Sequence, residues 1–183
     1  LVQVFASKPD ESFTVQLSNS VRKAIPSAII IGTTTLGEIT EGKTISESTV
    51  LSLSFFEEAG IEVIAMDCPY GCEREVGEIM AKRIMEIPTV IKGVFLLVTT
   101  QTVNGGKLLD GICSTIGGFP LFGAGAGCYG FNNDSFIFFG NRIYRNGLIS
   151  VVFSGERLNI EAYTCLGWQA LSKEMTVTEA EDY

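Results

Sequence analysis

The sequence contains no histidine among its 183 residues. Histidine is the commonest general base near neutral pH, so its absence excludes Ser-His-Asp and Cys-His catalytic arrangements and histidine-ligated metals. Charged residues are also scarce, at 19% of the chain against roughly a quarter in an average soluble protein, whereas 46% of the residues are apolar. A chain with this many apolar residues can offset the entropy lost on folding, which excludes disorder. Its length suits one domain.

Basic residues are few, and no cluster of them is present. The 13 Lys and Arg residues stand against 21 Asp and Glu residues, for a net charge of −8, whereas a nucleic-acid-binding protein needs a positive face. The longest apolar runs, such as Val94–Val98, fall far short of the ~20 residues that span a bilayer. No signal-peptide pattern is visible, so we expect a cytoplasmic protein. Leu1 opens directly into a strand-like run, so we expect that upstream sequence has been trimmed.

The five cysteines are odd in number and scattered, so we expect no disulfide framework in a chain of this size. Only Cys68 and Cys72 lie close together, with three residues between them, whereas zinc and redox motifs usually have two. We interpret the cysteines as reduced thiols, with a metal or redox role for this pair as the minor alternative. No metal and no cofactor is therefore expected.

Apolar residues recur at helical spacing in three segments. The first segment follows Ser7–Asp10, which supplies N-cap chemistry, and it ends at Pro26. The second covers Glu73–Ile87 and the third covers Lys107–Ile116, with Gly117 placed to cap the end of the third. The sequence therefore predicts three helices that alternate with strands.

Nine short segments have the pattern of β-strands: Leu1–Ala6, Ala28–Ile31, Leu51–Phe55, Ile61–Met66, Gly93–Thr100, Phe119–Phe122, Phe136–Phe139, Leu148–Phe153 and Leu158–Thr164. The Leu51–Phe55 and Ile61–Met66 strands are predicted to pair through a turn around Gly60, and the last three strands to form an antiparallel meander. Gly93–Thr100 is apolar on both faces, which predicts a central strand.

The order of elements repeats after about 91 residues, and Gly32 and Gly123 occupy corresponding places in the two halves. Each half reads as strand, helix, strand, glycine loop and antiparallel strands. Two such units bury their open faces most simply against each other. The sequence therefore predicts an α+β fold with mixed, largely antiparallel sheets, helices packed outside, and a helix–sheet–sheet–helix layering.

The segment from Thr33 to Glu38 is the first candidate binding site. The hydroxyls of Thr33, Thr34 and Thr35, together with Gly37 and the Glu38 carboxylate, follow a buried strand in a predicted loop. There the backbone and these polar groups can approach a ligand closely. The alternative is an ordinary turn, with the threonines bonded to nearby backbone and Glu38 in solvent.

A glycine-rich loop is predicted at residues 123–127, and its Gly123, Ala124 and Gly125 are the second candidate site. Residues 125–130 match the G-x-G-x-x-G pattern, but a strand rather than a helix follows, so we do not interpret the match as a dinucleotide site. A glycine loop that packs closely beside a pocket is the better interpretation.

Trp168 is the only tryptophan of the chain. It either stacks on a ligand or anchors the last strand, and we favour anchoring. No catalytic residue is predicted, because a cysteine nucleophile would need a base or a positive environment, and Asp67 beside Cys68 would raise the pKa of that thiol instead. Paired carboxylates stay open as an alternative.

Four segments carry family signatures, in order, along nearly the whole chain. Ile30–Ile39 is similar to "viGctsaGEi", Leu121–Gly127 to "lfGGaAgd", Gly147–Gly155 to a strand before an "sG" turn, and residues 167–180 to the ending "GW.p.gkem.vTka". Together these segments resemble the FIST N-terminal domain family. The resemblance implies a sensory module of signal-transduction proteins, mostly bacterial, that binds small ligands such as amino acids or their derivatives.

Three positions depart from that family pattern. Thr33 stands where the family often has cysteine, and Ala124 and Gly127 stand where it usually has Gly and Asp. The resemblance further implies that residues 1–183 are an N-terminal sensory domain, with a C-terminal FIST domain downstream. A signalling output domain or protein is the expected partner, and in eukaryotes the family occurs in an F-box protein.

The leading hypothesis is a non-catalytic ligand-sensing domain whose pocket is lined by the Thr33–Glu38 and Gly123–Gly127 loops and closed by Trp168. Glu38 would accept an ammonium group, and the threonine hydroxyls and glycine amides would bind a carboxylate. The alternatives are a histidine-independent hydrolase or acyl-transfer enzyme with Glu38 or Asp134 as base, and a protein-interaction scaffold. The apolar composition also predicts self-association, because the C-terminal domain would normally cover one face.

Overall fold

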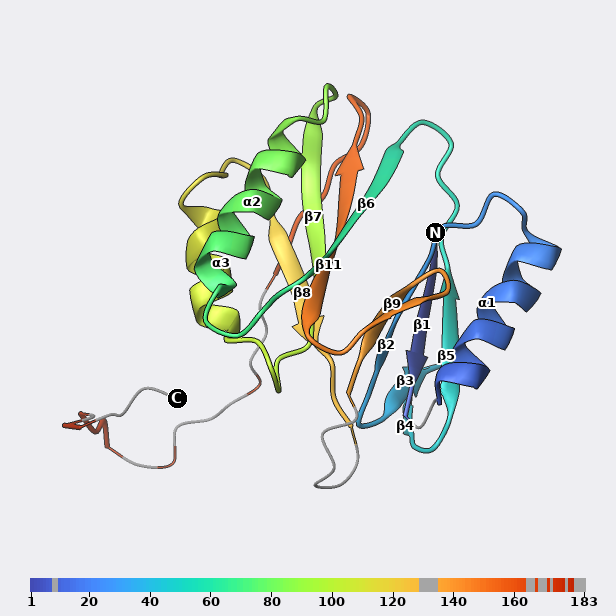
Figure 1. The fold of residues 1–183 in the computed structure, drawn as a ribbon, viewed down its shortest axis with the longest axis horizontal. Helices are drawn as coiled ribbons and strands as arrows, with labels where there is room; N and C mark the ends of the chain where they lie inside the picture. The colour runs from blue at the N-terminus through green and yellow to red at the C-terminus, as the bar shows by residue number, and fades with distance from the viewer. Residues whose placement is uncertain are drawn as a thin grey trace.

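The computed structural model describes residues 1–7, 10–128, 135–163, 167, 171, 173–176 and 178–179. Within these ranges the chain forms three helices and eleven strands, and most strand pairs are antiparallel. Two sheets face each other, with helix α1 outside one sheet and helices α2 and α3 outside the other (Figure 1). The prediction of an α+β fold with helices packed outside is therefore confirmed.

The first sheet is built around a parallel strand pair. Its order is β10–β9–β2–β1–β5, with β1 and β2 parallel and all other neighbours antiparallel. Its strands are β1 Val2–Ala6, β2 Ile30–Thr34, β5 Thr49–Leu53, β9 Ile137–Phe139 and β10 Arg142–Tyr144.

Helix α1 (Glu11–Ala24) connects these two parallel strands and covers the outer face of their sheet. It begins where the sequence predicts, because the Asp10 side chain accepts a hydrogen bond from the Phe13 amide at 2.6 Å and so caps the first turn. Leu17 and Val21 pack from the helix onto the sheet, against the buried side chains of Val2, Val4, Ile30, Phe136 and Phe138.

The second sheet also contains one parallel pair. Its order is β6–β11–β7–β8, with β7 and β8 parallel, and β7 lies between two neighbours as its apolar faces predict. Helices α2 (Glu73–Met85) and α3 (Gly105–Cys113) cover its outer face. The strands are β6 Gly60–Asp67, β7 Ile91–Val98, β8 Leu121–Gly125 and β11 Gly147–Ser154, and a separate hairpin consists of β3 Glu38–Thr40 and β4 Lys43–Ile45.

Three apolar clusters correspond to the three interfaces between the layers. One cluster lies between α1 and the first sheet, one lies between the two sheets, and one lies between the second sheet and helices α2 and α3. The middle cluster draws on strands of both sheets and contains Ile31, Leu97, Ala126, Ile137, Tyr144, Ile149, Val151 and Phe153. The helix–sheet–sheet–helix layering is therefore confirmed.

The two halves predicted from element order share a strand–helix–strand unit. In both units, the residue after the second strand donates its amide to the last residue of the first strand. Thr35 donates to the Ala6 carbonyl at 3.0 Å, and Ala126 donates to the Val98 carbonyl at 2.7 Å. Thr35 and Ala126 are separated by the predicted offset of about 91 residues. The repetition of β1–α1–β2 as β7–α3–β8 is therefore confirmed.

Gly32 and Gly123 occupy the same place in these two units, as predicted. Gly32 pairs with Val4, and Gly123 pairs with Leu96, both in parallel register. A Cβ atom on Gly32 would lie 2.2 Å from the Phe138 ring and 2.8 Å from the Val4 carbonyl oxygen, and one on Gly123 would lie 1.9 Å from the Leu96 carbonyl oxygen. Both parallel pairs therefore depend on a residue without a side chain at this point.

The two halves exchange strands, which differs from the sequence prediction. Strand β6 of the first half lies in the second sheet, while β9 and β10 of the second half lie in the first sheet. The predicted pairing of Leu51–Phe55 with Ile61–Met66 is therefore wrong, and so is the predicted meander of the last three strands. Alternating polarity indicates that a strand has a buried face, but it does not indicate which sheet supplies the neighbouring strand.

Three further segments differ from their predicted structure. The predicted strand at 158–164 is wrong over residues 158–163, which form no strand. The Leu158 and Ile160 side chains pack against the middle cluster instead. The last residue of the predicted strand, 164, lies outside the described part. Strand β2 extends to Thr34 and β8 covers Leu121–Gly125, so the two segments predicted as loops begin as strands. Parallel pairing continues beyond the apolar runs because main-chain hydrogen bonds do not require apolar side chains.

Helices α2 and α3 approach each other at two glycines. A Cβ atom on Gly77 would lie 2.4 Å from the Leu108 carbonyl oxygen, and one on Gly111 would lie 2.1 Å from the Arg74 carbonyl oxygen. Both obstacles are backbone atoms of the facing helix, which cannot rotate aside as a long side chain can. The contact between the helices is therefore set by the absence of side chains at these positions.

Gly111→Ala should separate the two helices and lower the free energy of unfolding by about 1–3 kcal/mol, as overpacking does in a well-packed interior. Urea unfolding followed by circular dichroism measures the change. Gly117→Ala is the matched control, because α3 ends at the C-cap Ser114 and not at the predicted Gly117 cap. A Cβ atom on Gly117 would meet nothing within 4 Å, so this variant should change the free energy by less than ~0.5 kcal/mol. Equal losses in the two variants would contradict the close-contact explanation.

Candidate functional site

The carboxyl ends of β1, β2, β7 and β8 lie together at one edge of the molecule, the lower edge in Figure 1. The first turns of α1 and α3 lie at this edge too, because these helices follow β1 and β7. The two sheets are joined here, since the Gly127 amide donates to the Thr34 carbonyl at 3.0 Å. Ligands of parallel sheets commonly bind outside the carboxyl ends of the strands. We call this region the strand-end edge.

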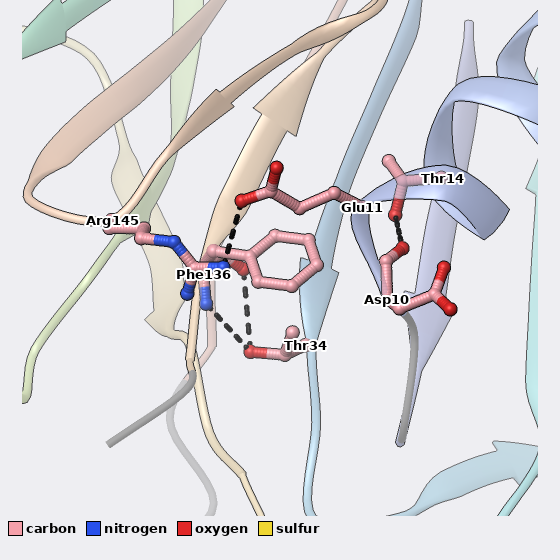
Figure 2. Close-up of polar contacts among 6 residues, drawn as sticks. All are labelled: Asp10, Glu11, Thr14, Thr34, Phe136 and Arg145. Carbon is pink, nitrogen blue, oxygen red and sulfur yellow. Dashed lines mark hydrogen bonds and ion pairs between the residues drawn. The ribbon is translucent and has the colours of Figure 1, made fainter. Parts of the chain in front are cut away.

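The hydroxyls of Thr33 and Thr34 are bonded within the protein. Both residues lie in β2 with buried side chains, and Thr33 Oγ1 donates to the Thr34 carbonyl at 3.0 Å. Thr34 Oγ1 donates to the Phe136 carbonyl at 3.3 Å and accepts from the Phe136 amide at 3.1 Å (Figure 2). The Thr34 hydroxyl therefore fastens the end of β2 to the residue before β9, while the Thr33 hydroxyl is satisfied within β2 itself.

Thr35 and Glu38 form a buried polar group with Ser7, which we call the Glu38 cluster. Glu38 Oε1 accepts hydrogen bonds from Ser7 Oγ at 2.5 Å and from Thr35 Oγ1 at 2.6 Å. Glu38 Oε2 is buried and has no hydrogen-bond partner in the described part of the chain. The interpretation of Glu38 as a solvated turn residue is therefore wrong. Gly37 lies between Thr35 and Glu38, in the short connection from β2 to β3.

Gly123, Ala124 and Gly125 lie in β8 and border an apolar hollow of about 260 Å³ between β8 and α3. Gly123 and Gly125 pair with Leu96 and Val98, whose side chains pack on the side of α2 and α3. Because the two glycines have no side chains on that side, the hollow stays open. Its lining consists of Leu96, Val98, Thr100, Gly105, Leu108, Leu109, Leu121, Phe122, Gly123, Ala124 and Gly125.

A polar hollow of about 710 Å³ adjoins the apolar one, and Thr100 and Gly105 line both. Its wall includes the first turn of α3, where Asn104 caps the helix by accepting from the Lys107 amide at 3.1 Å. First-turn amides have no partner within their helix, and the helix dipole makes this end positive, which favours negatively charged groups beside it. Its lining consists of Tyr70, Gly71, Glu73, Thr100, Gln101, Thr102, Val103, Asn104, Gly105, Gly106 and Lys107.

Gln101 connects the polar hollow to the joint between the sheets. Its carboxamide oxygen accepts from Ser135 Oγ at 2.7 Å, and Ser135 precedes Phe136 in the chain. Arg145, in the turn after β10, pairs with Glu11 of α1 at 2.8 Å and lies over the Phe136 ring at 5.5 Å (Figure 2). These contacts tie the first turn of α1, the residues before β9 and the polar hollow into one region.

Glu73 is a buried acid in the wall of the polar hollow. Its own backbone amide, the amides of Gly71 and Asn104, and the Lys107 ammonium lower the pKa of the Glu73 carboxyl from its ordinary value, against the opposing effect of burial. Since these partners come from both helix starts, the charged Glu73 fixes the first turn of α2 against that of α3.

The sequence prediction missed the residues of the polar hollow because it began the third helix at Lys107. The signal that could have found them is Asn104, an N-cap residue three positions earlier. The sequence analysis gives Ser7 a role only in helix capping. In the structure its hydroxyl donates a hydrogen bond to Glu38. The prediction for Trp168 lies outside the described residues.

Cys68 is fully buried and adjoins the first turn of α2. Burial, followed by the charges of Glu73 and Cys72, raises the pKa of the Cys68 thiol to about 11, so its reactive thiolate is scarce at neutral pH. Over the described ranges, no group of three or more His, Cys, Asp or Glu side chains could hold a metal ion.

Glu73 makes the stability of the fold depend on pH in a defined direction. A carboxyl whose pKa is lower in the folded state stabilises the fold above its unfolded-state pKa, near 4.5, and this stabilisation is lost as pH falls through the folded-state value. Glu73→Gln should therefore lower the melting temperature at neutral pH, and the gap to the wild type should close in acid. Thermal unfolding followed by circular dichroism from neutral to acidic pH measures the gap.

The matched control for this experiment is Glu75→Gln, which removes an exposed carboxylate from the same helix turn. It should leave a small difference in melting temperature that changes little with pH. A gap between Glu73→Gln and the wild type that widens toward acid would show that the charged form of Glu73 does not stabilise the fold.

No helix in the described part of the chain combines the length and apolar character needed to cross a membrane. A search of curated proteins gives no match to the sequence. The profile of the FIST N domain family matches residues 1–183, the full length of the sequence. Domains of this family are sensory and generally non-catalytic parts of signal-transduction proteins. The chain therefore belongs to the FIST N domain family, and the resemblance drawn from its motifs is confirmed.

Proposed function

We propose that this domain senses a small molecule in the two adjoining hollows, and that the ligand is an amino acid or a close derivative. The observation that carries the proposal is the junction of the hollows: the glycine-bordered apolar hollow meets the positive end of α3 at Thr100 and Gly105. A molecule with an apolar side chain next to a carboxylate matches this pattern. The sensory role of the family supports a binding site over a catalytic one.

The ligand carboxylate is assigned to the first turn of α3. Gly105, Gly106 and Lys107 all line the polar hollow, and the two glycines bring backbone amides that a side chain does not shield. The Lys107 ammonium adds a positive charge, and Asn104 fixes the turn through its bond to the Lys107 amide. A carboxylate in this place gains charge-assisted hydrogen bonds.

The apolar part of the ligand is assigned to the hollow between β8 and α3. A volume of about 260 Å³ suits a short side chain. Gly123 and Gly125 let the ligand contact the strand directly, and Ala124 completes the border. A Cβ atom on Gly125 would lie 2.3 Å from Thr100 Oγ1, so even alanine there would crowd the junction.

The ammonium group of the ligand has two acceptors in the polar hollow, the Glu73 carboxylate and the Thr100 hydroxyl. From sequence we assign the ammonium group to Glu38, and the carboxylate to the threonine hydroxyls and the glycine amides. Neither hollow is lined by Thr33, Thr34, Thr35, Gly37 or Glu38. In this proposal those residues support the joint between the sheets while the hollows bind the ligand.

Ligand binding in the hollows would connect β8 to the first turns of α3 and α2. The ligand would favour the arrangement of these three elements that it contacts best, and so shift the population of the domain. We propose that this shift is the signal and that a C-terminal FIST domain and an output domain receive it.

Calorimetric titration with a panel of amino acids tests the proposal. At least one amino acid with a small apolar side chain should bind saturably. Lys107→Gln should weaken that binding about tenfold, which corresponds to losing about 1.4 kcal/mol of charge-assisted hydrogen bonding. Lys82→Gln is the matched control, because it removes an exposed lysine of α2 that lines neither hollow, and it should bind as the wild type does.

Leu109→Trp tests the apolar hollow separately. Leu109 borders the hollow with an exposed side chain, so the fold should tolerate the larger residue. The variant should lose binding of the bulkier apolar amino acids before that of the smallest. The proposal fails if the whole panel gives neither heat nor thermal stabilisation, or if Lys107→Gln and Lys82→Gln weaken binding equally.

A further inference from the structure

Glu38 has a buried carboxyl oxygen that its described surroundings do not satisfy. The side chain is 2% exposed, and both of its hydrogen-bond donors, Ser7 Oγ and Thr35 Oγ1, are neutral hydroxyls that bind Oε1. The buried Oε2 has no hydrogen-bond partner, and Glu38 forms no ion pair, within the described ranges. A buried carboxylate is stable only where hydrogen bonds and a positive charge offset its lost hydration.

The oxygen atoms of the Glu38 cluster indicate which kind of group would complete it. A hydroxyl that donates one hydrogen bond keeps lone pairs on its oxygen, so Ser7 and Thr35 can still accept. The cluster thus offers one carboxylate and two hydroxyl oxygens with a single negative charge. It lacks the several carboxylates of a calcium site and the nitrogen or sulfur ligands of a zinc site, and it suits a singly charged cation.

We propose that the Glu38 cluster binds a monovalent cation of the potassium or ammonium class through Glu38 Oε2. The cation neutralises the buried carboxylate and arrives either as a free ion or as the ammonium head of a small organic molecule. Ser7 follows β1, Thr35 follows β2 and Glu38 begins β3, so the cation holds three chain segments together. The site does not depend on the function proposed above, because these residues line neither hollow.

The cation site adjoins the joint between the two sheets. Thr35 follows Thr34, whose carbonyl accepts the Gly127 amide at 3.0 Å, and Thr35 itself donates to the Ala6 carbonyl. A cation at Glu38 therefore stabilises the segment on which the contact between β2 and the end of β8 is built. The stability of the domain should consequently depend on which monovalent cation is present, and not on ionic strength alone.

Thermal unfolding of the 183-residue chain in chloride salts of equal concentration tests the proposal. Potassium or ammonium chloride should raise the melting temperature relative to tetramethylammonium chloride, whose cation is too large for a buried cluster. The rise should saturate with salt concentration, as linked binding requires. Glu38→Gln keeps the size of the side chain and removes the charge, so it should abolish the difference between salts, whereas the exposed Glu75→Gln should retain it.

Two further measurements keep the test decisive if Glu38→Gln does not fold. Ser7→Ala and Thr35→Ala each remove one hydroxyl oxygen, and both should raise the half-saturating potassium concentration several-fold. Rubidium, a heavier substitute for potassium, should give an anomalous-scattering peak beside Glu38 Oε2 in crystals of the unaltered chain.

Methylammonium chloride and glycine distinguish the two sources of the cation. Stabilisation by potassium and ammonium ions identifies a free ion, and Glu38-dependent stabilisation by the organic amines alone identifies an organic ligand; either result supports the proposal. Equal melting temperatures in all salts and amines, or a salt difference that survives in Glu38→Gln, would overturn it. Because the test of the hollows uses Lys107→Gln and a calorimetric signal, each proposal can fail while the other stands.

Discussion

Two parallel strand pairs impose most of this architecture. Parallel neighbours need a crossover connection, and both crossovers, α1 and α3, run over the outer face of their sheet (Figure 1). The inner faces are then left to pack on each other, and the four carboxyl ends of the paired strands meet at one edge. Gly32 and Gly123 permit the close main-chain approach on which each pair depends. The hollows and the buried acid at the strand-end edge follow from this pairing.

The two strand–helix–strand units end in different chemistry at that shared edge. With the offset of about 91 residues, Thr34 and Thr35 of the first unit correspond to Gly125 and Ala126 of the second. Hydroxyls at the first pair bond to Phe136 and Glu38 and close that end. In the second pair, Gly125 leaves the border of the apolar hollow without a side chain. In our proposals the closed end holds a cation and the open end binds the sensed molecule.

The layers and the repeat could be predicted from sequence because they depend on local patterns. Helical spacing, the Asp10 cap and the order of elements each act within a short stretch of chain. Sheet membership could not be predicted, because β5 and β6 have similar patterns and yet join different sheets. Their partners are decided by contacts with β1 and β11, which lie far away in the sequence.

The candidate site was accessible from sequence in part, for the same physical reason. Glycines at 123 and 125 could be recognised as places of close approach, and the structure places them beside a hollow. The burial of Glu38 could not be foreseen, since it depends on contact with Ser7, which follows β1 and lies 31 residues earlier in the chain. The polar hollow at the start of α3 could be predicted only by recognising Asn104 as the helix cap. Its other wall comes from the start of α2, which is distant in the sequence.

A ligand that occupies the adjoining hollows must change the surroundings of particular backbone amides. Amide chemical-shift mapping of the isotopically labelled chain during an amino-acid titration observes them directly. We expect the amides of Gly105, Gly106, Gly123 and Gly125 to shift together and to saturate with ligand, while those of α1 stay unchanged. Saturable shifts confined to another region, such as the β3–β4 hairpin or β5, would contradict a sensory site between β8 and α3.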